Sequence, residues 1–92
     1  MFKYVEICFN RNPKEDGFAF ECMKTAYQYS IKGRMVYSSG AGITVEAEGE
    51  SDRISEFIRW ISGKNQNCNL RVNQETSIHT GKFKEFDLLR LE

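Results

Sequence analysis

The chain has 92 residues, 40% of them hydrophobic, and its 13 basic side chains balance 13 acidic ones. This length fits one domain with a modest core. The absence of net charge argues against a nucleic-acid-binding or membrane-surface protein. No apolar run approaches the roughly 20 residues of a membrane span, and the chain begins directly with a strand pattern. We therefore expect one domain over residues 1–92 with no signal peptide, and residues 91–92, Leu-Glu, resemble a cloning junction.

The sequence contains an odd number of cysteines, namely Cys8, Cys22 and Cys68, and no Cys-x-x-Cys pair. This pattern favours free thiols in a reducing, cytoplasmic location over a disulfide framework or a zinc site. We expect neither a metal nor a cofactor.

The first half of the chain begins with a predicted strand over residues 2–10, in which apolar and polar side chains alternate. Residues 11–17 form a polar loop that contains the only proline. A helix is predicted over 18–31 and is expected to end at Gly33. Helical spacing places mainly small side chains on one face of it: Ala19, Cys22, Met23, Ala26, Tyr27 and Ser30.

Two strands follow, over 34–38 and 43–48, joined by a glycine-rich hairpin. In the second of them Ile43, Val45 and Ala47 share one face and are expected to be buried. The other face carries Thr44, Glu46 and Glu48, and we expect it to be open to water.

A second helix is predicted over 51–62, with Ser51 as N-cap and Asp52 at the positive end of the helix dipole. Gly63 is expected to stop it. Its apolar stripe consists of Ile54, Phe57, Ile58 and Ile61. These four side chains and Val5, Ile7, Ile43 and Val45 form the predicted core.

Two further strands are predicted, over 69–75 and 83–91. The order of elements indicates an α+β, ferredoxin-like βαββαβ fold with a fifth strand at its C-terminal end. Right-handed crossovers place both helices on one face of an antiparallel-rich sheet.

The central stretch resembles the acylphosphatase family, whose members carry a similar strand, the run Ala-Glu-Gly (here 47–49) and a helix that ends near a Trp-like position (here Trp60). The resemblance implies hydrolysis of carboxyl-phosphate bonds without metal or covalent intermediate. A first signature, Gly-x-Val-Gln-Gly-Val-Gly-Phe-Arg, cradles phosphate with backbone N–H groups and its arginine. A second signature is Gly-Trp-Val-Arg-Asn, and its final asparagine orients the attacking water.

The resemblance covers almost the whole chain but fails at both catalytic positions. With Gly33 aligned on the glycine of the second signature, Tyr37 stands at the asparagine. Counting back places Gly17-Phe18 on the family's Gly-Phe, and Ala19 stands at the arginine. Glu15 and Asp16 replace a Gly-Val pair, and their negative charge would repel phosphate.

Two functions remain open on this evidence. The favoured interpretation is a catalytically degenerate, acylphosphatase-like domain that binds a protein or a small anionic ligand. The alternative is an active acylphosphatase with a relocated cation. The candidate residues of the anion loop are Arg11, Asn12, Lys14, Gly17 and Phe18.

Three further readings carry less weight. His79 has no partner by motif, and an exposed loop residue is the simpler interpretation. RNA binding on the sheet needs aromatics on the strand over 43–48, which shows Thr44, Glu46 and Glu48 instead. Arg34 is a second candidate for a relocated cation.

Overall fold

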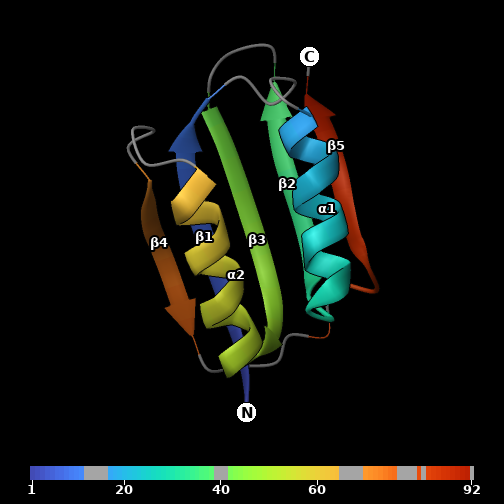
Figure 1. Ribbon diagram of the computed structural model, residues 1–92, viewed down its shortest axis with the longest axis vertical. Coiled ribbons are helices and arrows are strands. Elements are labelled where there is room, and N and C mark those ends of the chain that lie inside the picture. Colours follow the sequence, from blue (N-terminus) through green and yellow to red (C-terminus); the bar gives the residue numbers. More distant parts are fainter. Residues whose placement is uncertain (12–16, 39–41, 65–69, 77–80, 82, 92) are drawn as a thin grey trace.

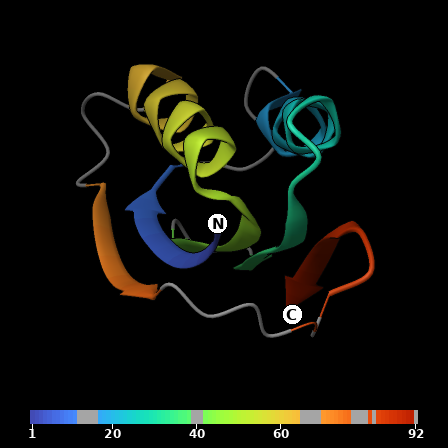
Figure 2. The same cartoon turned by 90° about the horizontal axis from the view of Figure 1, so that it is seen from below.

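The computed structural model describes residues 1–11, 17–38, 42–64, 70–76, 81 and 83–91. One five-stranded sheet has the order β4-β1-β3-β2-β5, and two helices pack on one of its faces (Figures 1 and 2). The elements are β1 (Phe2–Asn10), α1 (Phe18–Gln28), β2 (Lys32–Ser38), β3 (Gly42–Glu50), α2 (Ser51–Lys64), β4 (Arg71–Thr76) and β5 (Phe86–Leu91). The predicted ferredoxin-like fold is confirmed.

The strands pair as the topology requires. β1–β3, β1–β4 and β2–β3 are antiparallel, whereas β5 runs parallel to β2. The pairing of β5 with β2 reaches Leu91, opposite Ser38. Since β4 and β5 lie at opposite edges, the chain between them has to cross the sheet.

The core lies between the sheet and the helices. It contains the apolar side of β1 and β3, the stripe of α2 and the small residues of α1. All eight predicted core residues belong to it, with Ile58 only partly buried at its edge. Phe57 is fully buried, and its ring meets the Phe86 ring edge-on at a centroid distance of 6.0 Å.

The first helix ends earlier than predicted, at Gln28 rather than residue 31. Ser30 takes a left-handed conformation with φ 56°, so its N–H bonds the Tyr27 carbonyl and the Ile31 N–H bonds the Ala26 carbonyl. This pair of hydrogen bonds is a Schellman motif, with serine where glycine is usual. Tyr27, which was predicted on the packed face of the helix, lies on its exposed side instead.

Gly33, predicted to end the first helix, lies inside β2 instead. Its φ of +154° is in the range that favours glycine, and a Cβ there would come within 1.9 Å of the Glu46 carbonyl oxygen. Its N–H donates to the Glu85 carbonyl at 3.0 Å. Gly33 therefore lets β2 approach β3 closely while it holds the chain that enters β5.

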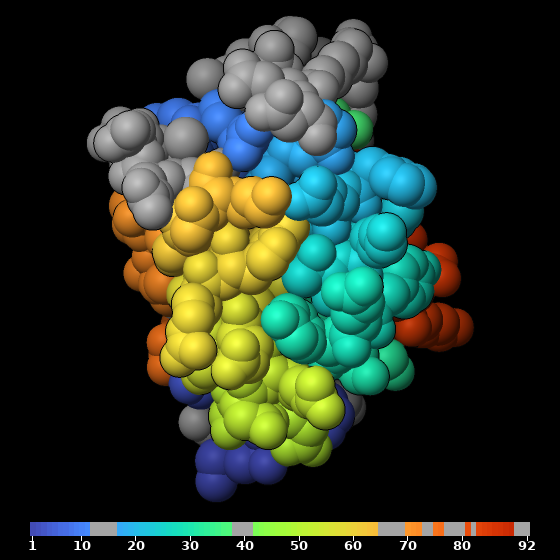
Figure 3. All heavy atoms as spheres, in the orientation of Figure 1, coloured from blue at the N-terminus to red at the C-terminus, as the bar shows by residue number. Residues whose placement is uncertain are grey.

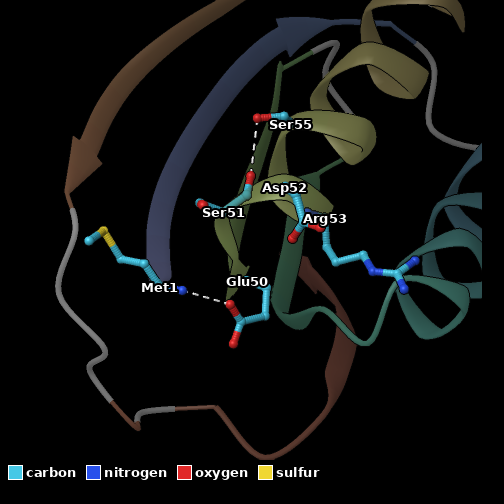
Figure 4. Close-up of polar contacts among 6 residues, drawn as sticks. All are labelled: Met1, Glu50, Ser51, Asp52, Arg53 and Ser55. Atoms are coloured by element: carbon cyan, nitrogen blue, oxygen red, sulfur yellow. Dashed lines mark hydrogen bonds and ion pairs between the residues drawn. The ribbon is translucent and has the colours of Figure 1, made fainter.

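The second helix also differs at its ends. It continues through Gly63 to Lys64, so this glycine does not stop it. At its start, the Ser51 N–H donates to the Met1 carbonyl at 2.8 Å, and the Met1 ammonium contacts the Glu50 carboxylate at the same distance (Figure 4). The hydrogen bond and charge of Glu50 raise the pKa of this ammonium.

Gly33→Ala and Gly63→Ala should have opposite effects on stability. The first adds a methyl group against the β3 backbone and should cost roughly 2–4 kcal/mol. The second adds a methyl group in open space on a helix and should stabilise by up to about 1 kcal/mol. Urea unfolding measures both, and equal effects would contradict the assigned role of Gly33.

Phe57→Ala should lower the free energy of unfolding by roughly 3–5 kcal/mol, because it leaves a cavity under α2. Phe20→Ala, which truncates an exposed phenylalanine, is the matched control and should change it by less than about 0.5 kcal/mol. A loss below about 1 kcal/mol for Phe57→Ala would show that this ring is not central to the core.

Candidate functional site

The described residues of the predicted anion loop lie at the end of the sheet where β1 and β2 finish and α1 begins (Figure 1). Among the described residues, this end brings together Arg11, Gly17, Phe18, Ala19 and Tyr37. The remaining candidates of the loop, Asn12 and Lys14, lie outside the described residues, as do Glu15 and Asp16.

Phe18 is the fixed point of this region. Its ring meets Phe9 edge-on at 5.7 Å and stacks on Trp60 of α2 at 5.9 Å. The guanidinium carbon of Arg11 lies 4.3 Å from the centroid of the same ring. Cation–π contacts of this kind are worth about 0.5–1 kcal/mol at exposed sites, so Phe18 holds the Arg11 charge beside the start of α1.

Gly17 precedes the helix in a left-handed conformation, φ 64° and ψ 29°, and caps it without a side-chain hydrogen bond. The first backbone N–H groups of a helix lack intrahelical partners and form the positive end of its dipole. Arg11 adds a full positive charge nearby. These two features favour anions electrostatically, against the repulsion expected from Glu15 and Asp16, which lie outside the described residues.

Ala19 and Tyr37 are the two positions that the sequence comparison predicts to replace the family's catalytic residues. Ala19 is 9% exposed and its methyl group belongs to the core. Tyr37 is half-buried and packs against the edge of the same core, level with Ile43 in the neighbouring strand. Neither side chain provides a guanidinium or an amide.

The face of the sheet opposite the helices holds a polar cluster that the sequence did not predict as buried. Glu46 is 7% and Glu48 2% exposed, so the expectation that they face water is wrong. One oxygen of the Glu46 carboxylate accepts a 2.8 Å hydrogen bond from the Tyr4 hydroxyl, and the other pairs with Nε of Arg34.

Phe83, which precedes β5, contributes to the cover on this face. The Arg34 guanidinium lies 5.9 Å from the centroid of the Phe83 ring. The sequence signal that could have indicated this cluster is the placement of Tyr4 and Arg34 on neighbouring strands, beside Glu46.

Arg34, the second predicted candidate for a relocated cation, is therefore engaged away from the loop. It lies on the opposite sheet face from Arg11 and Phe18, in an ion pair with Glu46. Of the arginines considered, only Arg11 is placed at the start of α1.

The described cysteines are free thiols. Cys8 Sγ lies 3.6 Å from Oγ1 of Thr44, and burial raises the pKa of the Cys22 thiol to about 12. Cys68 and His79 lie outside the described residues. In the described part of the chain, no three metal-binding side chains gather, and no helix is long and apolar enough to cross a membrane.

Comparison with known proteins identifies the family. The model of the acylphosphatase family matches residues 14–88. Among solved structures, the acylphosphatase from Bacillus subtilis is 16% identical, with 97% of this chain and 99% of that chain covered and a TM-score of 0.78. No curated protein matches the chain.

Two other solved structures share the fold. Full-length HypF in the phosphate- and nucleotide-bound form is 24% identical, covering 97% of this chain but 12% of that one, with a TM-score of 0.71. The dark state of the BLUF protein BlrB is 14% identical, covering 97% of this chain and 72% of that one, with a TM-score of 0.79. At these identities the likeness concerns the fold alone.

Tyr4→Phe should lower stability at neutral pH but not at strongly alkaline pH. Burial, and then the hydrogen bond to Glu46, raise the pKa of the Tyr4 hydroxyl above its ordinary value. The folded state thus keeps Tyr4 protonated, so its contribution is complete below about pH 10 and is lost as the pH rises further. At pH 7 the variant should lose about 1–2 kcal/mol.

Urea unfolding of Tyr4→Phe and the unmodified chain between pH 7 and 11 measures this difference. It should shrink above about pH 10. Tyr27→Phe is the matched control, because the Tyr27 ring is exposed. A difference that stays constant with pH would contradict the buried hydrogen bond.

Proposed function

The chain belongs to the acylphosphatase family, and we propose that it acts as a small binding module that has lost the hydrolysis of acyl phosphates. The observation that carries this proposal is the buried methyl group of Ala19 at the position of the family's phosphate-binding arginine. An arginine–phosphate clamp supplies charge-assisted, bidentate hydrogen bonds that no alanine replaces.

Tyr37 supports the same proposal. The family's asparagine orients the attacking water, whereas Tyr37 presents a bulky ring packed against the core edge. Since this reaction depends on positioning and on charge stabilisation, loss of both groups removes most of what the fold contributes to rate.

What remains at this end of the sheet is suited to binding. The start of α1 and the Arg11 guanidinium attract negative charge. We propose that the ligand is a small anion or an acidic group on a partner protein. The free thiols of Cys8 and Cys22 support a reducing, cytoplasmic location for this role.

A second candidate function is an active acylphosphatase that uses Arg11 as its cation. The specific observation in its favour is the 4.3 Å contact that holds the Arg11 guanidinium over Phe18, beside the start of α1. Against it stands Tyr37, because no amide replaces the family's asparagine there.

Steady-state hydrolysis of benzoyl phosphate at neutral pH separates the two functions. The 92-residue chain should show no turnover above the spontaneous rate, with the Bacillus subtilis acylphosphatase as positive control. Turnover on the order of 1 s⁻¹, an ordinary enzymatic rate, would refute the proposed loss of catalysis.

If turnover is found, alanine substitutions identify the cation. Arg11→Ala should then abolish activity if Arg11 is the relocated cation. Arg53→Ala, at an exposed position near the start of α2, is the matched control and should not change it.

A further inference from the structure

One helix of this protein presents aromatic side chains to solvent. Phe20 is 66% and Tyr27 54% exposed, although large apolar side chains on a helix are usually turned toward the core. Met23, which is half-buried, and Lys24, which is exposed, lie between them in sequence. These four residues are called the α1 outer strip.

The spacing makes the strip continuous. Phe20, Met23 and Tyr27 follow the i, i+3, i+7 pattern of one helix face, and Phe20 and Tyr27 lie about 10 Å apart along the axis. Lys24 lies beside the middle of this row. No ion pair of Lys24 is found within the described chain, nor any hydrogen bond or ring contact of the Phe20 and Tyr27 side chains.

The second helix shows that this is not a general property of the surface. Its exposed side carries Asp52, Arg53, Glu56 and Arg59, of which Arg59 and Glu56 lie 3.6 Å apart as an ion pair. Both helices form the same face of the molecule (Figure 3). The exposed aromatic side chains of α1, which have no exposed counterpart on the described part of α2, are the observation on which the following proposal rests.

We propose that the α1 outer strip docks an acidic amphipathic helix of a partner protein. Two apolar side chains of that helix, one or two turns apart, would pack against Phe20 and Tyr27, and a carboxylate between them would pair with Lys24. This inference goes beyond the proposed function, because the α1 outer strip is a different surface from the start of α1 beside Arg11.

Charge argues against the other possible occupants of the strip, which are a second copy of the chain, a membrane and a nucleic acid. In a two-fold dimer through this strip, Lys24 lies near the middle and would face its own copy, which is repulsive. Anionic membranes and nucleic acids attract proteins through many cations, whereas this strip carries only Lys24, which can pair with a single carboxylate. A carboxylate-bearing helix complements both the aromatic pair and the cation.

The test uses two helical peptides of about 18 residues, each with one leucine stripe, flanked by glutamates in one peptide and by lysines in the other. Fluorescence anisotropy with the full chain should show tighter binding of the glutamate peptide. The double variant Phe20→Ala/Tyr27→Ala should weaken it about tenfold or more. Lys24→Glu should reverse the preference, by roughly threefold or more.

Arg59→Glu is the matched control, because it makes the same change of charge on the exposed side of α2, and it should leave both affinities unchanged. Circular dichroism establishes that the variants, all at exposed or half-exposed positions, keep the fold. Equal binding of the two peptides, an unchanged preference in Lys24→Glu, strip-dependent dimerisation, or strip-dependent binding to anionic vesicles or oligonucleotides would overturn the inference.

The outcomes separate this inference from the proposed function. Turnover of benzoyl phosphate would refute the loss of catalysis while peptide binding to the strip still stood. Absence of peptide binding would refute the docking surface while the absence of turnover still stood.

Discussion

The need to pair the buried carboxylate of Glu46 is the constraint on which the centre of the sheet depends. It is buried on the central strand β3, so it has to be paired, and its two oxygens receive Tyr4 from β1 and Arg34 from β2. Removing one partner of such a group costs more than the pair itself contributes. The same Arg34 lies against Phe83, so the chain entering β5 is fixed by the interaction that joins the three central strands.

The end of the sheet at which α1 begins is held together differently. Around the start of α1, apolar contacts dominate: Phe18 packs on Phe9 and Trp60, and Ala19 joins the core. The fold at this end is therefore maintained by apolar packing. Because fold and function are separable, this packing is compatible with the proposed role of the chain as a binding scaffold.

The fold was largely predictable because the apolar periodicity of β1, β3 and α2 is strong and agrees with the burial observed. The errors have physical causes. Ser30 adopts the left-handed conformation that sequence reasoning assigned to a glycine, so α1 ends three residues early. Glu46 and Glu48 looked solvated because alternation reports only which face a side chain takes, not what later covers that face. The stacking of Arg11 on Phe18 requires tertiary geometry and leaves no local pattern.

The most direct test of the central claim is phosphorus NMR of acetyl phosphate mixed with an equal concentration of the chain at neutral pH. Stoichiometric protein reveals even a single slow turnover, which a steady-state assay would miss. If the chain does not catalyse the reaction, acetyl phosphate should disappear, and inorganic phosphate should appear, at the rate seen in buffer alone. Conversion faster than in buffer, lost again in Arg11→Ala, would contradict the claim and assign the reaction to the cation held over Phe18.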